Sequence, residues 1–275
     1  MRGSSWSGRG LGLATGLVLL AGMVVLVGVV PWLTPDPNAV DYAGKLAAPS
    51  GEHLLGTDQA GRDVLARLAA GARISLGAAM LVSAVTFAIG LAVGLATALL
   101  GGVVDVALSR LVDVLLAVPH VVLALAIVGV LGPGLRNLVV AMVIAGWAPF
   151  ARYARTFARA VLDRPYVLAA RMAGVGRWRA AWRHVLPAAF LRLLAVATLG
   201  VGEVVLGLSA LSFLGLGVAP PAAEWGQMVA ESRTYAAQAP WLVIVPGMAV
   251  VCAVACAALL GDALEDRLDR EGGAG

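Results

Sequence analysis

Six apolar runs, most of them about as long as a membrane is thick, constrain this chain more than any other feature. A helix rises 1.5 Å per residue, so roughly 20 residues cross a hydrocarbon core of about 30 Å. The runs occupy residues 11–33, 74–100, 111–131, 135–150, 191–211 and 241–260, of which the fourth is the shortest. Each run is therefore a predicted transmembrane helix.

The overall composition supports lipid as the main solvent. Hydrophobic residues make up 60% of the 275 residues and charged residues only 13%, whereas soluble domains are nearer half apolar and a quarter charged. The first apolar run follows Arg2 and Arg9 but is longer than the core of a cleaved signal peptide, so we interpret it as an uncleaved anchor. The predicted fold class is an all-α integral membrane protein with about six transmembrane helices.

The placement of positive residues predicts the orientation, because Lys and Arg near short loops are retained in the cytoplasm. With the N-terminus inside, fourteen of the twenty fall on the cytoplasmic side, nine of them between Arg152 and Arg192. Both termini of this multi-pass protein are then expected to be cytoplasmic. The pI near 9.6 needs no nucleic acid to explain it, since most of the excess lies in one loop.

These spans divide the chain into four predicted parts. Residues 1–33 form a cytoplasmic N-terminus and the first span, and residues 34–73 an external loop whose amphipathic part from Val64 to Ala69 should lie on the membrane surface as a short helix. Residues 74–261 form a five-helix core, with a cytoplasmic loop at 152–190 and an external segment at 212–240 that folds back onto the bundle. Residues 262–275 form a cytoplasmic tail.

The residues that enzymes need are missing from the sequence. The three histidines, His53, His120 and His184, are far apart, and the chain contains neither H-E-x-x-H nor G-x-S-x-G. Lys45 is the only lysine, so no G-x-x-x-x-G-K phosphate loop exists and ATP hydrolysis would need a partner. We expect a non-catalytic chain without cofactor or metal, in which His120 either packs within the bundle or lines a pathway.

The loop at 152–190 has an ordered pattern that the positive-inside rule does not explain. Residues 166–173 suit a helix that glycines would end, and a second amphipathic piece runs from Trp178 to Pro187. Such a surface can dock on another protein. The pattern consists of Ala169, Ala170, Gly174, Gly176, His184 and Pro187.

In this loop the chain resembles the permease subunits of type I ABC importers, within the dipeptide, oligopeptide and nickel branch. The family's coupling motif is Glu-Ala-Ala, three residues, Gly, and later His-x-Leu-Pro; here Leu168 stands in the glutamate position. Residues 55–63, the stretch from Asp105 through Asp113 to Pro119, and residues 211–226 also match that branch.

The resemblance implies a location in the bacterial inner membrane, and it implies partners as well as a fold. It implies a second, homologous permease that completes the channel, two ATPases docking on residues 169–176, and an external solute-binding protein. The substrate would be di- or oligopeptides, with nickel or a metal chelate as the alternative. A membrane enzyme is disfavoured by the missing catalytic residues, and a gated pore or scaffold would leave the loop pattern without a purpose.

Charged residues inside the spans are candidates for the pathway. An ionised carboxylate at a helix centre costs about 2.5 to 3.5 kcal/mol on insertion scales, so neither Asp113 nor Glu203 should face lipid. Arg110 precedes Asp113 by three residues, which favours an ion pair on one helix face. Glu203 has no charge three or four residues away. It is protonated, paired across a dimer, or exposed to the pathway.

Overall fold

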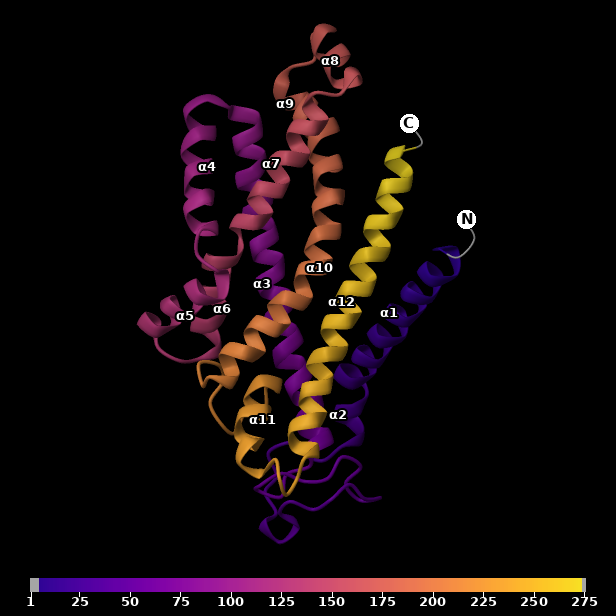
Figure 1. Cartoon of the computed structure of the whole chain (residues 1–275), viewed down its shortest axis with the longest axis vertical. Coiled ribbons are helices and arrows are strands. Elements are labelled where there is room, and N and C mark those ends of the chain that lie inside the picture. Colours follow the sequence, from indigo (N-terminus) through magenta and orange to yellow (C-terminus); the bar gives the residue numbers. More distant parts are fainter. Residues whose placement is uncertain (1–4, 274–275) are drawn as a thin grey trace.

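The computed structural model describes residues 5–273 as a bundle of long helices with a small polar cap at one end (Figure 1). Within this range there are helices and loops but no strand, apart from one isolated bridge between Thr57 and Asp63. The long helices are α1 (Ser5–Gly28), α3 (Val64–Leu100), α4 (Gly102–Leu116), α5 (His120–Leu131), α6 (Leu135–Gly146), α7 (Ala148–Leu162), α10 (Leu186–Phe213) and α12 (Trp241–Gly273). Shorter helices are α2 (Val30–Leu33), η1 (Tyr42–Gly44), α8 (Pro165–Met172), α9 (Arg177–Ala180), the π-helical η2 (Ala181–Val185), α11 (Trp225–Ser232) and η3 (Arg233–Tyr235).

Five helical segments of the described chain are long and apolar enough to cross a membrane, and a bent pair of helices makes a sixth. The prediction of about six spans and an all-helical membrane fold is confirmed. The run at 111–131, predicted as one span with a proline inside it, is split into α4 and α5, whose axes differ by 86°. Pro119 lies at the bend as the residue before α5. Because proline has no N–H to donate, one helix cannot run through it undisturbed.

Two predicted spans are longer in the structure than the apolar pattern suggested. The run at 135–150 continues through α6 and α7 to Leu162, and Pro149 is accommodated in the first turn of α7, where a backbone N–H has no helical partner. The last helix runs from Trp241 to Gly273 without a break at Pro246. Both extensions are amphipathic or charged, so a hydropathy pattern alone does not reveal them.

The separate surface helix expected near residues 64–69 is absent from the structure. Those residues form the first turns of α3, a single helix of 37 residues. The side chain of Asp63 caps its start by accepting a hydrogen bond from the Ala66 N–H at 2.8 Å. Val64, Arg67 and Ala69 are all buried. The amphipathic pattern therefore indicated a protein interior, not a membrane surface.

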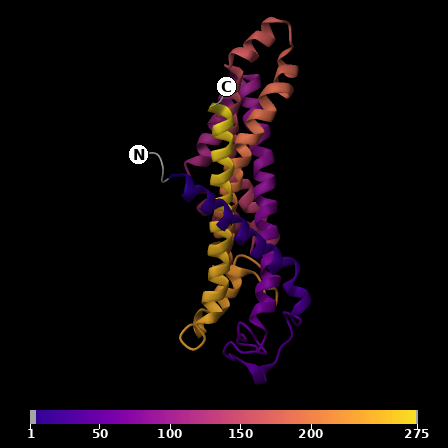
Figure 2. The same cartoon turned by 90° about the vertical axis from the view of Figure 1, so that its right-hand side faces the viewer.

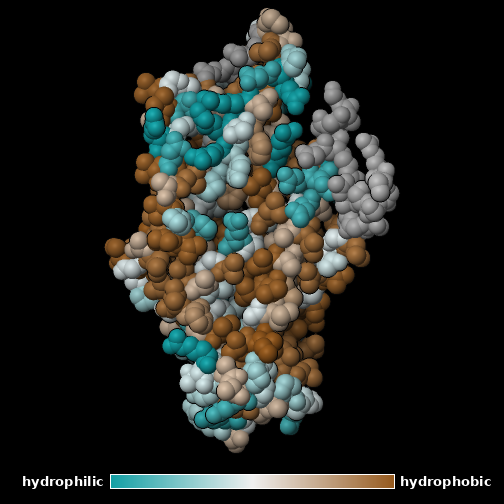
Figure 3. Space-filling model, viewed as in Figure 1, coloured by the Kyte–Doolittle hydropathy of each residue, from teal (hydrophilic) through white to brown (hydrophobic). Residues whose placement is uncertain are grey.

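Helix α10 lies at the centre of the bundle, between α3, α7 and α12 (Figure 1). Figure 2 shows that the bundle is a narrow slab, with α1 crossing the face of α12. Gly94 lets α3 and α7 approach closely, since a Cβ there would lie 2.5 Å from the Cβ of Ala154. A broad hydrophobic band covers the middle of the visible face (Figure 3), as expected for a surface in contact with lipid.

The segment between α10 and α12 folds back onto the bundle, as the sequence suggested. Its helix α11 packs against α10, α12 and α3. Trp225 is fully buried and donates its indole N–H to the Leu68 carbonyl at 3.1 Å. Residues 34–63 lie at the same end of the molecule, opposite the end that carries α8 (Figure 1).

Candidate functional site

The residues of the predicted docking loop come together in one hairpin at the tip of the molecule. Helix α8 and helix α9 project beyond α7 and α10, away from the polar cap (Figure 1). Val167 and Val185 are completely buried and pack with Ala158 and Val161 at the base of the hairpin. The hairpin is thus anchored on α7 and on the start of α10, so a force on the hairpin bears on both helices.

Gly174 sets the turn between the two short helices. Its φ of +87° lies in the left-handed region that favours glycine. The Val175 N–H donates to the Ala170 carbonyl at 3.0 Å and the Ala173 N–H to the Ala169 carbonyl at 2.9 Å. The bond from Val175 to Ala170, which spans five positions in the sequence, is the 6→1 contact of a Schellman cap. The motif glycine is therefore needed for the backbone of this turn.

The outer surface of the hairpin carries several large apolar side chains that are unusually exposed. The exposed fractions of the side chains of Met172, Trp182 and Trp178 are 84%, 70% and 57%. Leu168, which stands in the glutamate position, is 44% exposed on the same hairpin. Exposed apolar surface of this kind, outside the lipid band, marks a surface for a protein partner.

The remaining motif residues have mixed placements. Ala169 is exposed and Ala170 half-buried, while Gly176 accepts the Ala180 N–H at 3.0 Å and so begins α9. Pro187 occupies the first turn of α10. His184 is half-buried and meets the ring of Tyr166 edge-on at 5.6 Å between centroids. It therefore fastens η2 to α8.

An arginine-rich ion network lies near the same end, where α4 packs beside α7. The two carboxylate oxygens of Asp105 accept from Arg155 at 2.7 and 3.1 Å and from Arg159 at 2.6 Å. Asp113 pairs with Arg152 at 2.5 Å. The predicted pair between Arg110 and Asp113 is therefore wrong, because α7 supplies a closer cation than the same helix does. Within residues 5–273, Arg110 makes no ion pair.

Glu203 is an exposed acid halfway along α10. Its side chain makes no hydrogen bond or ion pair with the described part of the chain. Leu206, Ala210 and Phe213 continue the same exposed face toward the polar cap. His120, at the start of α5, is also exposed but belongs to the bend between α4 and α5, not to this face.

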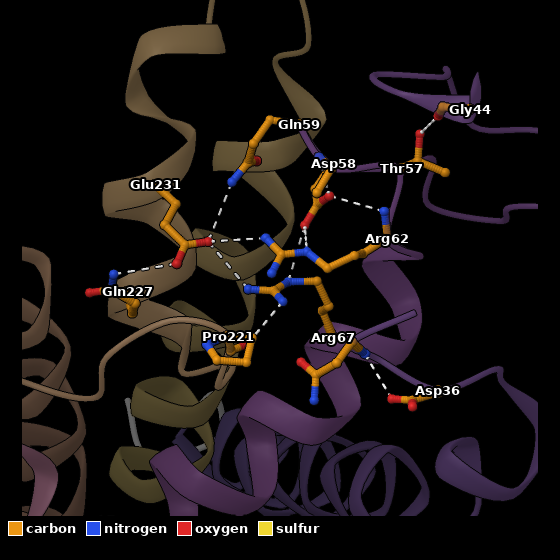
Figure 4. Close-up of polar contacts among 12 residues, drawn as sticks. Asp36, Gly44, Thr57, Asp58, Gln59, Arg62, Arg67, Pro221, Gln227 and Glu231 are labelled. Atoms are coloured by element: carbon orange, nitrogen blue, oxygen red, sulfur yellow. Dashed lines mark hydrogen bonds and ion pairs between the residues drawn. The ribbon is translucent and has the colours of Figure 1, made fainter. Parts of the chain in front are cut away.

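A buried ion cluster joins the polar cap to the bundle (Figure 4). Asp58 accepts from Arg62 at 2.6 Å and faces Arg67 at 3.3 Å, and Glu231 of α11 faces the same two arginines at 3.5 and 3.3 Å. Arg67 is only 1% exposed. Because two cations meet two anions, the buried charges balance. The sequence motif of residues 55–63 contains Asp58 and Arg62 but not Glu231. The pairing of the arginines with Glu231 joins positions more than 150 residues apart.

Glu224 is a second buried acid of the cap that the sequence did not single out. It accepts from the Ser75 hydroxyl at 2.9 Å and from the Gln227 N–H at 3.0 Å, and so caps α11. Burial raises the pKa of its carboxyl above the usual value, although the backbone and hydroxyl donors act in the opposite direction. Only its position just before a short helix could have indicated this role.

Comparison with known proteins gives one consistent family. The family described as the inner membrane component of binding-protein-dependent transport systems matches residues 67–270. The nickel transport system permease protein NikC of Escherichia coli is 40% identical over 238 residues, which is 86% of each chain.

Other relatives carry peptide names. The dipeptide transport system permease protein DppC of Alkalihalophilus pseudofirmus is 37% identical over 227 residues, 82% of this chain and 75% of the relative. The di/tripeptide transport system permease protein DppC of Pseudomonas aeruginosa is 39% identical over 246 residues, 87% of this chain and 81% of the relative. The chain therefore belongs to the inner membrane components of binding-protein-dependent transport systems, as an ABC importer permease of the dipeptide and nickel branch.

Proposed function

We propose that this permease forms one half of a translocation channel and that a homologous permease, as in a heterodimer, forms the other. Two separate ATPase subunits would dock on the α8–α9 hairpin, and an external solute-binding protein would deliver the substrate to the polar cap. The exposed apolar hairpin carries this proposal, because its anchoring on α7 and α10 lets it convert a movement of the ATPase into a rigid-body movement of two helices.

We further propose that the channel alternates between two openings. ATP and the loaded binding protein would favour the outward-open state by population shift. Glu203 would face the shared pathway, since an exposed carboxylate in mid-span cannot face lipid cheaply. The orientation that fits this scheme has α8 and both chain ends in the cytoplasm, as the distribution of arginine favours.

For the substrate we propose di- or oligopeptides, with nickel as the second candidate. The motifs of residues 55–63 and 211–226 belong to the peptide and nickel branch as a whole and support both candidates. The similarity to the peptide permeases supports the first, and the similarity to the nickel permease of Escherichia coli supports the second, nickel or a metal chelate. Uptake of labelled dipeptide and of radioactive nickel should be compared in vesicles that contain the complete transporter. Saturable, ATP-dependent uptake of only one of them identifies the substrate class.

The coupling role is tested by Gly174→Arg. We expect the variant to insert and assemble, but to lose both uptake and the stimulation of ATP hydrolysis by loaded binding protein. Arg at φ +87° disrupts the cap of α8 and adds bulk to the docking surface. Gly102→Arg is the matched control. Gly102 also has a positive φ, and an added Cβ there meets nothing within 4 Å, but this residue lies outside the hairpin.

Leu168→Glu completes the test, since it restores the residue that the family motif usually has. We expect uptake close to that of the unchanged protein, because the exposed side chain can carry a charge at little cost. Normal stimulated hydrolysis in Gly174→Arg, or the same defect in Gly102→Arg, would refute the proposed role of the hairpin.

A further inference from the structure

A cavity of about 320 Å³ opens between α3, α4 and α7 near the hairpin end of the molecule. We call it the basic cavity. Its polar wall is formed by Asp105, Ser109, Arg110, Asp113, Arg152 and Arg155. Neither the docking hairpin nor the exposed face of Glu203 contributes to it.

The basic cavity carries an excess of positive charge. Asp105 is shared between Arg155 and Arg159, which leaves one of those two charges uncompensated. Asp113 forms its ion pair with Arg152, and within residues 5–273 Arg110 has no ion-pair partner. Three guanidinium groups of the lining thus face two carboxylates, and Arg159, which lies outside the lining, adds a further positive charge beside Asp105. A site with this surplus attracts an anion, in contrast to the balanced cluster of the polar cap.

The types of side chain favour phosphate among the common anions. Guanidinium groups present planar pairs of N–H donors that match the oxygens of phosphate. Arg152 is 54% exposed even though it pairs with Asp113, so its remaining donors are open to a ligand. The Ser109 hydroxyl is 3.4 Å from Asp105 and can turn toward an incoming phosphate oxygen.

The position of the cavity favours a lipid over a free ion. Val93, Val106 and Val112 line the same cavity as the arginines. On α4 the side chains of Val103, Val106 and Val114 are 85%, 60% and 67% exposed, which makes an apolar surface beside the opening. Figure 3 shows a hydrophilic patch over the region of α4 and α7, directly above the hydrophobic band. That border is the depth at which a phospholipid places its phosphate.

We propose that the basic cavity binds the phosphate headgroup of an anionic phospholipid, with the acyl chains lying along the valine face of α4. Arg110 and Arg152 provide the free donors, and Asp105 holds Arg155 and Arg159 in place behind them. In the proposed orientation this lipid belongs to the cytoplasmic leaflet, where anionic lipids recognise basic pockets between helices. Lipid binding at this cavity does not depend on which substrate the transporter carries.

The test measures lipid retention by the complete purified transporter in nanodiscs and by native mass spectrometry. We expect phosphatidylglycerol to be retained in preference to phosphatidylcholine. Arg110→Gln and Arg152→Gln should each weaken the binding of phosphatidylglycerol about tenfold, the effect of one lost charge-assisted contact. Arg136→Gln is the control, because Arg136 is exposed at the start of α6, away from the cavity.

A variant with the opposite expected effect guards against simple misfolding. Asp113→Asn removes the acid that competes for Arg152, and Asp113 is 53% exposed, so we expect tighter retention of phosphatidylglycerol in a folded protein. Equal retention by the unchanged protein, Arg110→Gln and Asp113→Asn would overturn the proposal. Inorganic phosphate is titrated in parallel, and binding of inorganic phosphate without any preference for phosphatidylglycerol would also overturn it.

Discussion

Glu203 and Glu224 show how position decides the behaviour of a carboxylate. Glu224 is enclosed and accepts hydrogen bonds from a serine hydroxyl and the start of α11. Glu203 is exposed in the middle of α10 and has no partner in the described part of the chain. The first therefore acts within this chain, whereas the second is open to contacts from outside it.

Replacement of Glu203 tests its surroundings. We expect Glu203→Gln to retain assembly and most uptake, because it keeps size and polarity, whereas Glu203→Lys should abolish transport by reversing the charge in mid-span. Uptake and co-purification of the second permease are the measurements. Glu265→Lys, an exposed charge reversal near the end of α12, controls for charge alone. Full uptake by Glu203→Lys would contradict a pathway or interface position.

Glu224 should make stability depend on pH. Its pKa is raised in the folded protein, so the folded state holds the proton more tightly than the unfolded state does. The resulting stabilisation is complete below the ordinary pKa of 4.5 and is lost as the pH rises through the folded pKa. Thermal unfolding in detergent should show this decline, and Glu224→Gln should flatten it. An equal pH dependence in the variant would assign the effect to other groups.

At the scale of elements, the packing of α3 on α7 depends on two small residues. A Cβ at Gly90 would lie 2.3 Å from the Cβ of Phe150, and one at Gly94 would lie 2.6 Å from the Ala151 carbonyl oxygen. Helices in lipid gain stability from such close approach, because there is little hydrophobic effect between them. These contacts also hold α7 in place beneath the hairpin.

Gly94→Leu should separate α3 from α7. We expect destabilisation of about 1 to 3 kcal/mol, the usual cost of overpacking, and a lower yield of assembled transporter. Gly77→Leu is the matched control, since Gly77 lies on the same helix and a Cβ there meets nothing within 4 Å. Thermal stability in detergent and the yield after size exclusion distinguish the two variants. Equal behaviour would show that the close contact is not required.

At the scale of the whole molecule, polar segments gather at two opposite ends of an apolar slab. Residues 34–63 and α11 lie at one end, and α8, α9 and the end of α12 lie toward the other (Figures 1 and 2). The apolar band between the two polar ends has to lie within the hydrocarbon core of the membrane. The structure thus assigns each polar segment to one of two ends, and the distribution of arginine predicts which end is cytoplasmic.

Reporter fusions test this orientation. We expect fusions at residues 50 and 225 to report the outer side, and fusions at residues 105, 175 and 270 to report the cytoplasm. A reporter that is active only in the cytoplasm and one that is active only outside should give complementary signals. A cytoplasmic signal at residue 50 would reverse the orientation and place the basic cavity in the outer leaflet.

The sequence by itself determined the class of fold, the family and the turn at Gly174. Apolar runs identify spans because a membrane demands a fixed length of hydrophobic helix, and the loop motif is local, with Gly174 enforcing a turn within a few residues. Pro119 indicated a disturbance of the helix between α4 and α5. The hydrophobic pattern of residues 111–131, however, does not distinguish one continuous helix from two helices joined by a sharp bend.

Only the tertiary structure decided which charges meet. Asp113 could pair with Arg110 on its own helix or with Arg152 on α7, and the packing of α4 beside α7 selected the second. Arg67 likewise finds Glu231 through the folding of α11 onto α3. Hydrophobic length is a property of one segment, so the sequence reveals it directly. An ion pair depends on where two distant segments come together in space, and the sequence pattern does not specify the distance between them.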